Sequence, residues 1–417
     1  MTDSGQKTQK VMIIGASHAG VACAEQLRLN GFSGHVTLID RLAGKPLERP
    51  PLSKAFLQAD DDDETRFLLR RDDWFDTQDV RLIDGREVTG IDVVNHSVEL
   101  DDGGVHPYDR LILATGALPR WLAGTEQMRR AFVLRDPDDA RAIRATIPQA
   151  KTAIIVGGGY IGLEAAASLV KAGLDVHVVE MADRLLARVA SPEISAFFTA
   201  LHQDHGVHVH LDALSDEILQ DESGFIGVRL GDGRRLDGDM LLVGIGVAPD
   251  TALAEAAGIV TDNGIVVDAT MQTSVADVYA IGDVARWSDA AMRIESVDNA
   301  QCGALAAAAA ICGRTPPSTA APWFWSEQFD VRLQSAGIVP AASSTVRRMV
   351  RPGKRAGGMS VWSYDSGTLV AVEAVRDPAA YALGKTCLDR AITPPLNDVG
   401  DPGFDLKAFI AQAEAQA

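Results

Sequence analysis

Continuous apolar runs alternate with glycine-rich turns and helical patterns along much of this chain. The clearest instance begins with the apolar run 153–156, which leads into a G-x-G-x-x-G turn starting at Gly157. Residues 161–171 then place apolar side chains at helical spacing, and a second apolar run, 176–179, ends at Glu180. Short apolar runs bounded by turn residues are typical of buried parallel strands. The pattern therefore predicts a strand–helix–strand unit.

The glycines and the acid of this unit match the chemistry of a dinucleotide. Gly157 permits the tight turn, Gly159 lets the backbone approach a pyrophosphate, and Gly162 packs the helix on the strand. Free N–H groups at the start of the helix would hold the phosphates. Glu180 follows Gly162 by eighteen residues and would accept the ribose hydroxyls of an adenosine. The alternative is a glycine-rich turn in an unrelated sheet, and the complete strand–helix–strand context disfavours it.

The same unit occurs near the start of the chain. Its parts are the strand 11–14, a turn with Gly15, Ser17 and Gly20, the helix 19–29, the strand 36–39 and the terminal acid Asp40. Two such units predict two bound dinucleotides, with electrons passing between them. A hydrolase nucleophile elbow at Ser17 is excluded, because Ala19 stands where that motif needs glycine.

Further strands follow each unit and extend the duplication. The predicted strands are 81–91, 93–100 and 111–117 after the first unit, and 224–230, 235–240 and 241–246 after the second. The last strand of each set ends in small residues that can pass close to a cofactor. Residues 278–283 form a later buried strand that ends in Asp283. An acid in that place is costly unless it is paired or bonded, which makes Asp283 a ligand candidate.

The segment 49–54, Arg-Pro-Pro-Leu-Ser-Lys, is stiffened by two prolines, and Ser53 is expected to cap a short helix starting near Lys54. A rigid segment with a cation at each end suits an anionic ligand. A proline turn with two surface cations is an equally good interpretation. Longer helices are predicted at 136–147, 191–205, 299–311 and 405–415.

Composition limits the remaining choices. A chain of 417 residues with 47% hydrophobic residues predicts two or three folded domains. The net charge of −18 disfavours nucleic acid and anionic membrane as partners. No apolar run reaches transmembrane length, residues 1–10 lack the apolar core of a signal peptide, and four scattered cysteines do not form a disulfide framework. These features predict a cytoplasmic protein.

Two clusters of ionisable residues have competing interpretations. His202, His205, His208 and His210 resemble a metal site in spacing, but the first pair would lie on a helix and the second on a strand, so surface histidines and no metal are predicted.

From residue 323 the composition changes to a strand-rich segment that predicts a small α+β domain. Its basic cluster, residues 347–355, is either a solvated hairpin or a docking patch for an acidic partner.

Seven motifs carry a resemblance to a known family. They are Gly15-x-Ser17-x-x-Gly20, Arg49-Pro-Pro-Leu-Ser-Lys54, Ala114-Thr115-Gly116, Gly157-Gly-Gly-Tyr-Ile-Gly-Leu-Glu164, Tyr279-Ala-Ile-Gly-Asp283, Glu295-Ser-Val297 and Pro322-Trp-Phe-Trp-Ser326. Over nearly its whole length the chain resembles the FAD-dependent pyridine-nucleotide reductases, specifically the NADH-dependent ferredoxin reductases of oxygenase systems. The resemblance implies an α/β fold like that of glutathione reductase. It implies an FAD domain (1–118 and 247–322), a Rossmann-like NAD domain (119–246) and a C-terminal α+β domain (323–417).

The resemblance also implies site residues. Lys54 would lie beside the reactive flavin nitrogen, paired with Glu164, and these two would be catalytic. Asp40 would bind the ribose of FAD and Asp283 its ribityl chain. The full set of implied cofactor-binding residues is Gly15, Ala16, Ser17, His18, Gly20, Asp40, Arg41, Arg49, Lys54, Val88, Ala114, Thr115, Gly116, Arg135, Gly157, Gly159, Tyr160, Ile161, Gly162, Glu164, Glu180, Gly246, Gly282, Asp283, Glu295, Ser296, Val297 and Trp325.

The cysteines indicate the subfamily. Disulfide reductases and peroxidases on this fold need cysteine shortly after the first acid, and residues 41–54 contain none. The implied reaction is therefore hydride transfer from NADH to FAD, then single-electron transfers to an acidic 2Fe-2S ferredoxin serving a monooxygenase or dioxygenase. Glu180 favours NADH, because a 2′-phosphate would meet a like charge. The alternatives are a rubredoxin reductase, an NADH oxidase, or an NADH-sensing flavoprotein of the apoptosis-inducing-factor type.

Overall fold

The computed structural model describes residues 9–59, 61, 63–290, 292–318 and 320–416. Residues 1–8, from which the absence of a secretion signal was predicted, lie outside this range. The chain divides into two compact lobes, described separately below. The first lobe comprises Met1–Arg49, Asp61–Leu118 and Val247–Thr319, and the second comprises Pro50–Asp60, Pro119–Gly246 and Ala320–Ala417.

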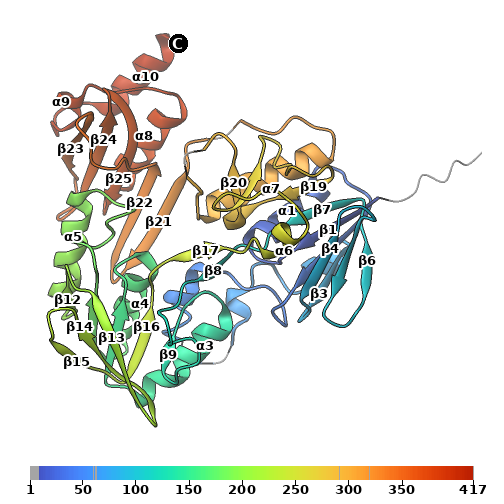
Figure 1. The fold of residues 1–417 in the computed structure, drawn as a ribbon. Coiled ribbons are helices and arrows are strands. Elements are labelled where there is room, and N and C mark those ends of the chain that lie inside the picture. The colour runs from blue at the N-terminus through green and yellow to red at the C-terminus, as the bar shows by residue number, and fades with distance from the viewer. Residues whose placement is uncertain (1–8, 60, 62, 291, 319, 417) are drawn as a thin grey trace, which may run out of the picture. The chain divides into compact units, whose positions relative to one another are not determined.

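A parallel five-stranded sheet forms the centre of the first lobe (Figure 1). Its order is β19 (Val278–Ala280), β7 (Arg110–Leu113), β1 (Lys10–Ile14), β2 (His35–Asp40) and β3 (Val80–Asp84). The helices α1 (His18–Leu29) and α7 (Val297–Ile311) pack against one another beside it. The central strand positions are apolar because both faces of the sheet are covered there, as Ile13, Leu38 and Ile112 show by their complete burial.

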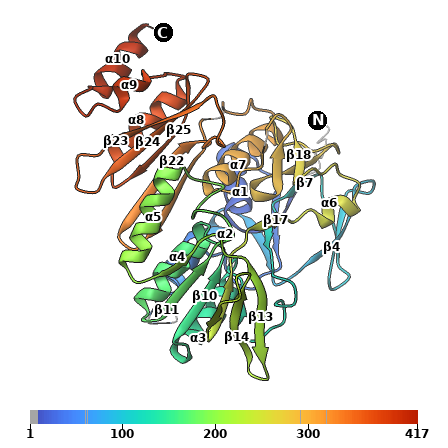
Figure 2. The same ribbon diagram turned by 60° about the vertical axis from the view of Figure 1, so that its left-hand side comes forward.

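The second lobe repeats this order (Figure 2). Its parallel sheet runs β9 (Ala131–Phe132), β16 (Met240–Val243), β10 (Thr152–Val156), β11 (Asp175–Val179) and β12 (His208–His210). The helices of this part are α3 (Pro137–Thr146), α4 (Tyr160–Lys171) and α5 (Pro192–Asp204). The predicted internal duplication is confirmed, because each glycine-turn unit occupies the same place in its sheet.

Each parallel sheet is accompanied by a small antiparallel one. The first lobe has β4 (Val88–Asp92), β5 (Ser97–Leu100) and β6 (Val105–Pro107), and the second has β13 (Ser215–Asp221), β14 (Gly224–Leu230) and β15 (Arg235–Asp237). The single strand predicted over 81–91 is wrong. Gly85, with φ of +64°, ends β3, and the chain then enters β4 in a different sheet.

Short elements occur in both lobes. They are the strands β8 (Ala117–Pro119), β17 (Val247–Pro249), β18 (Ile265–Val267) and β20 (Ala285–Trp287), the helices α2 (Trp74–Thr77) and α6 (Ala252–Ala256), and the 3-10 turns η1 (Pro50–Ser53), η2 (Thr65–Phe67), η3 (Ile147–Gln149) and η4 (Gly282–Val284). In the described part of the chain, no helix combines the length and the apolar character needed to cross a membrane.

The C-terminal segment forms the predicted α+β arrangement within the second lobe. An antiparallel sheet runs β21 (Trp323–Gln328), β22 (Val331–Gly337), β25 (Thr368–Val375), β24 (Met359–Asp365) and β23 (Val346–Pro352), followed by α8 (Pro378–Asp389), α9 (Leu396–Val399) and α10 (Leu406–Gln416). Gly384 lets α8 lie close on the sheet, since a Cβ there would meet Val372 at 2.7 Å. Arg351 of the basic cluster donates to the carbonyls of Val399, Asp401 and Phe404. That cation therefore holds the chain after α9 in place.

Candidate functional site

The first glycine of each turn is required by the protein itself. Gly157 has φ of +112°, and a Cβ there would lie 2.4 Å from the carbonyl oxygen of Gly244. Gly15 has φ of +103°, and its Cβ would lie 2.3 Å from the carbonyl oxygen of Ala114. No L side chain fits both that conformation and that space. Each turn is therefore pressed against the end of a neighbouring strand, which fixes where its helix begins.

The second glycine of the G-x-G-x-x-G turn, Gly159, is explained by a different requirement from that of Gly157. Gly159 has φ of −81° and ψ of 178°, an extended conformation open to any residue. A Cβ added there would have no described protein atom within 4 Å. The protein's own packing thus gives no reason for glycine. Open space beside a helix start is what a pyrophosphate needs.

The starts of α1 and α4 also differ from those of the other long helices. The helices α3, α5, α7, α8 and α10 each have a side chain that accepts from a first-turn N–H group, namely Asp136, Ser191, Ser296, Asp377 and Asp405. Within the described residues, neither Ser17 before α1 nor Gly159 before α4 makes such a bond. Neither helix has an acid in its first turn. Both helix starts therefore leave N–H donors and a positive dipole for phosphate, and the residues fit two dinucleotides.

The two terminal acids, Asp40 and Glu180, accept hydrogen bonds from the backbone of their own turns and can also accept from a ligand. Asp40 accepts from the backbone N–H groups of Ala16 at 2.6 Å and Leu42 at 2.9 Å. Glu180 accepts from Gly158 at 2.7 Å and Ala182 at 2.8 Å. An ionised carboxylate has about four acceptor sites, so two remain on each acid for ribose hydroxyls.

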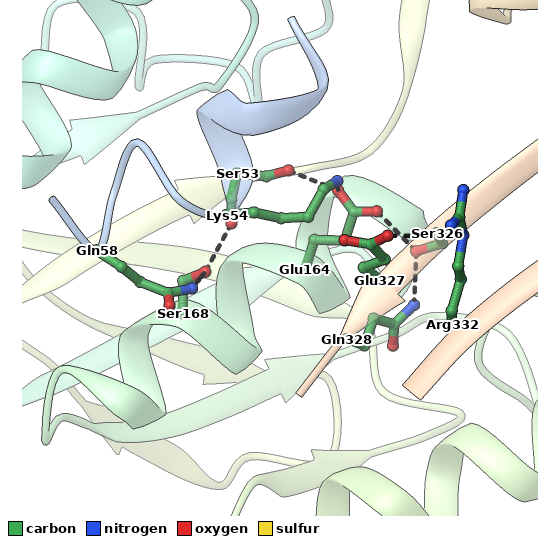
Figure 3. A network of polar contacts seen from close by, with 9 residues as sticks. All are labelled: Ser53, Lys54, Gln58, Glu164, Ser168, Ser326, Glu327, Gln328 and Arg332. Carbon is green, nitrogen blue, oxygen red and sulfur yellow. Dashed lines mark hydrogen bonds and ion pairs between the residues drawn. The ribbon is translucent and has the colours of Figure 1, made fainter. Parts of the chain in front are cut away.

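Lys54 and Glu164 form a tight, largely buried ion pair in the second lobe (Figure 3). The Lys54 Nζ lies 2.5 Å from Glu164 Oε2, and the two side chains are 17% and 7% exposed. Ser53 Oγ donates to the same oxygen at 2.5 Å. Ser326 Oγ donates to the other, Oε1, at 2.7 Å. Three donors orient this carboxylate, and their hydrogen bonds offset part of the cost of burying it.

A hydrogen-bonded arm continues from Ser326 into the lobe. Gln328 Nε2 donates to Ser326 Oγ at 3.1 Å, and Gln328 Oε1 lies 2.8 Å from His202 Nε2. Because the amide oxygen can only accept, His202 carries its proton on Nε2. His202 is fully buried, and burial lowers its pKa to about 4. Every donor in the arm thus points toward Glu164.

The predicted role of Ser53 as a helix cap is wrong. Pro50–Ser53 is a 3-10 turn, the residues after it form no helix, and the Ser53 hydroxyl is bonded to Glu164. The Ser53 carbonyl accepts from Ser168 Oγ at 2.7 Å, and Gln58 Nε2 donates to that hydroxyl at 2.9 Å. The stiff segment is therefore tied to α4 at both Glu164 and Ser168, which positions Lys54.

Residues predicted in the first lobe gather at the carboxyl ends of its strands. Arg41 reaches Asp250 at 3.9 Å, and Thr115 Oγ1 donates to the carbonyl of Asp250 at 2.8 Å. Arg49 Nε donates to Ser17 Oγ at 3.3 Å. These contacts join the ends of β1, β2 and β7 around the start of α1, where His18 is the first helical residue. Val88, by contrast, is buried in the apolar core at the start of β4.

The predicted strand ending at Asp283 is shorter than expected. The strand β19 stops at Ala280, and Asp283 lies half-buried in η4. A Cβ on Gly282 would meet the Cβ of Ala19 at 2.8 Å, so this turn lies against the start of α1. Ser296 caps α7 through the N–H group of Asn299, and Glu295 pairs with Arg293 at 2.6 Å. Val297 is the first residue of α7, where backbone N–H groups have no helical partner.

The remaining predicted residues lie in the second lobe. Tyr160 packs on Phe324 at 4.5 Å between ring centroids, and burial raises the pKa of its phenol. Ile161 is exposed beside Gly159 at the start of α4. Gly246, at φ of +106°, accepts from the backbone of Arg120. Trp325 stacks on Trp323 in β21, and Arg135 donates its backbone N–H to Asp139 before α3.

The four histidines do not act as a set, and the prediction of surface histidines is wrong for His202. His202 is buried against Gln328, and His205 stacks on Phe329 at 3.9 Å between centroids. His208 and His210 lie apart from them on β12. Sequence reasoning also missed Ser326 and Gln328 as partners of Glu164. Their two-residue spacing on a predicted strand places them on one face and could have indicated a shared role.

Glu373 is a second fully buried carboxyl group, on β25. It accepts from the backbone N–H group of Ser191 at 3.1 and 3.2 Å, and burial raises its pKa to about 7 from an ordinary 4.5. A carboxyl group with a raised folded-state pKa stabilises the fold below about pH 4.5 and loses this contribution as pH rises toward 7.

Replacing Glu373 by glutamine is expected to remove this pH dependence. The Glu373→Gln variant gains on the order of 3 kcal/mol over the wild type at pH 8 and under about 1 kcal/mol at pH 5. Urea unfolding at the two pH values measures the difference. Glu217→Gln, which alters an exposed pair with Arg229, serves as control and changes by less than about 0.5 kcal/mol at either pH. An equal effect of Glu373→Gln at both pH values would contradict the assignment.

Comparison with known proteins agrees with this geometry. Residues 9–304 match the family described as pyridine nucleotide-disulphide oxidoreductase, and residues 323–410 match the reductase C-terminal family. The chain therefore belongs to the pyridine nucleotide-disulphide oxidoreductase family. Its fold is the predicted one, two Rossmann-like dinucleotide-binding domains with a small C-terminal α+β domain.

Two relatives and one solved structure are similar to nearly the whole chain. Putidaredoxin reductase of Pseudomonas putida is 37% identical over 97% of this chain and 98% of its own length. A 5,5′-dehydrodivanillate O-demethylase ferredoxin reductase subunit of a Sphingobium species is 41% identical over 96% of this chain and 98% of the relative. Among solved structures, the covalent putidaredoxin reductase–putidaredoxin complex matches with a TM-score of 0.92 and 36% identity, covering 98% of this chain and 99% of that one.

Proposed function

We propose that this chain is an FAD-dependent NADH:ferredoxin oxidoreductase that supplies electrons to an oxygenase through a 2Fe-2S ferredoxin. FAD accepts an electron pair as hydride from NADH and can release the electrons one at a time. The observation that carries the proposal is the buried Lys54–Glu164 pair, anchored by Ser53 and Ser326. Lys54 ends the segment 41–54, in which a disulfide reductase would need cysteine and this chain has none.

Each group of site residues has its own role in the proposed reaction. The helix starts of α1 and α4, with Asp40 and Glu180, bind the two dinucleotides. Glu164 fixes the position of the Lys54 ammonium, and the cation stabilises negative charge that develops beside it. Ser53 and Ser326 hold the Glu164 carboxylate in place by donating to its two oxygens. Tyr160, packed on Phe324, would shield a bound flavin from water and would give way to nicotinamide.

Partner binding draws on the basic cluster of residues 347–355. Arg351 is used inside the lobe and Arg348 donates to the carbonyl of Pro340, while Arg347, Lys354 and Arg355 are exposed. An acidic ferredoxin would be attracted to these exposed cations, and salt would screen the attraction. A cytoplasmic location is proposed with this function, since Cys23, Cys302, Cys312 and Cys387 are all free thiols.

Anaerobic stopped-flow spectroscopy tests the proposal. The FAD-loaded protein is reduced with NADH, then mixed with an acidic 2Fe-2S ferredoxin while the iron–sulfur absorbance is followed. Fast loss of the yellow colour, followed by ferredoxin reduction that slows as salt rises, is expected. Electrons that pass only to oxygen would move the protein to the oxidase class. If the protein reduced rubredoxin faster than ferredoxin, rubredoxin would be assigned as its electron acceptor instead.

Glu180 is expected to set the preference for NADH. A 2′-phosphate would lie against its carboxylate, so Glu180→Gln lowers the ratio of kcat/KM for NADH over NADPH about tenfold, or about 1.4 kcal/mol. The amide oxygen can still accept one backbone bond of the turn, which limits the loss of stability. Steady-state kinetics with both cofactors measure the ratio, with Glu193→Gln as control. An unchanged ratio would show that Glu180 does not set the preference for NADH.

A further inference from the structure

Three side chains on the edge of the second-lobe sheet converge outside the site described above. They are Asp175 and His177 on β11 and His208 on β12, and one ligand atom from each lies within 4.8 Å of the other two. His177 pairs with His208 in the parallel register, and Asp175 is two residues before His177. Because side chains alternate along a strand, all three lie on one face of the sheet.

The atoms face one another in the manner of metal ligands. His208 Nε2 lies 3.1 Å from Asp175 Oδ1, and His177 Nε2 lies 3.6 Å from Asp175 Oδ2. Two ligands on one tetrahedral zinc ion, each about 2.1 Å from it, are about 3.4 Å apart. The two measured separations, one to each oxygen of Asp175, lie on either side of this value, and the three ligand atoms lie within 4.8 Å of one another, so an ion could enter with side-chain rotations.

A fourth residue orients the central ligand. His177 Nδ1 lies 3.1 Å from His210 Nε2, with the two rings only 8° from parallel. If Nδ1–H donates to His210, the lone pair of His177 is on Nε2, which faces Asp175 and His208. Metal-bound histidines are commonly held by such a bond from their other nitrogen.

We propose that Asp175, His177 and His208 form a binding site for a divalent transition-metal ion of the zinc class, with His210 orienting His177. Asp175 and His208 are about half exposed, so the ion can enter from solvent and keep water as its fourth ligand. The bound ion fastens the edge strand β12 to β11. The borderline nitrogen donors select zinc, nickel or copper over magnesium and calcium.

Isothermal titration calorimetry of the FAD-loaded protein, freed of metal with EDTA and desalted, tests the site. With zinc chloride as probe, one ion per chain is expected with a dissociation constant in the micromolar range, and magnesium chloride gives no heat. His208→Ala weakens zinc binding at least tenfold. Because this side chain is exposed on an edge strand, the variant should fold. His35→Ala, an exposed histidine of β2, leaves binding unchanged.

Two further measurements keep the proposal falsifiable. Copper(II) bound to the wild type should show an electron paramagnetic resonance spectrum with splitting from two imidazole nitrogens, and His177→Ala should reduce this to one. Zinc should raise the thermal unfolding temperature of the wild type and not that of His208→Ala. Zinc binding that is absent at 100-fold excess, or unchanged in the His177→Ala and His208→Ala double variant, would overturn the assignment.

Discussion

Replacing Glu164 by glutamine is expected to slow reduction of the FAD-loaded protein by NADH about a hundredfold. The carboxylate receives Lys54 and Ser53 on one oxygen and Ser326 on the other. An amide removes the charge that holds the ammonium and sets an NH2 donor against one of these donors. Loss of one preorganised electrostatic contact typically costs a factor of about 10² to 10³ in rate. Anaerobic stopped-flow at saturating NADH measures the effect as slower loss of the yellow colour.

A matched control lies close by in Figure 3. Glu327, next to Ser326 on β21, makes an exposed ion pair of 3.6 Å with Arg332. Glu327→Gln makes the same carboxylate-to-amide change beside Ser326 without touching Glu164, and its rate should stay within twofold of the wild type. Lys54→Met should slow reduction as much as Glu164→Gln, and the double variant should add little, because the two residues act as one unit. If Glu164→Gln were reduced by NADH at a rate within twofold of the wild type, the Lys54–Glu164 pair would have no role in the mechanism.

The second large effect is expected at Gly159. Gly159→Val should raise the dissociation constant for NADH at least a hundredfold, or about 2.7 kcal/mol, while the fold changes by about 1 kcal/mol or less. The backbone conformation suits valine, and the added side chain meets no described protein atom within 4 Å of its Cβ. The space it fills is the space we assign to the pyrophosphate. Titration of the variant with NAD⁺ and NADH, followed by absorbance, measures the loss.

Gly157→Val separates folding from binding. Its Cβ would lie 2.4 Å from a carbonyl oxygen at a positive φ, so this variant should lose several kcal/mol of stability. The two variants carry the same substitution two residues apart. If Gly159→Val lost as much stability as Gly157→Val, the glycine would be explained by packing and the ligand assignment would fail.

The two glycine-turn units could be predicted from sequence because their signals are local. A strand, its turn, its helix and its acid all lie within about thirty residues, and each part has its own physical signature. The helix α3 was predicted for the same reason, since Asp136 and the following proline mark its start and a capping box forms there. The break at Gly85 was missed although the polar residues 84–87, Asp-Gly-Arg-Glu, interrupt the apolar pattern there, and Asp-Gly is a turn signal.

The surroundings of Glu164 were beyond sequence reasoning for a different reason. Ser53 and Ser326 are separated from Glu164 by 111 and 162 positions. Such contacts depend on how three distant segments pack, which no local pattern encodes. His202 was misjudged because a histidine on a helix is usually solvated, and its buried partner lies 126 positions away. The Asp175–His177–His208 group needed the register between β11 and β12, which only the paired strands reveal.

The starts of α1 and α4 have no side-chain cap in the described residues. The stability of this protein therefore depends on the supply of the dinucleotides that bind there. A side-chain cap is always present, whereas a dinucleotide leaves when its concentration falls below its dissociation constant. By mass action, protein made under riboflavin shortage has a larger unfolded population, and that population is what proteases degrade. The steady-state amount of the enzyme should therefore follow the flavin supply of the cell, even at constant synthesis. Riboflavin added during expression should raise the yield of intact chain before any change in transcription.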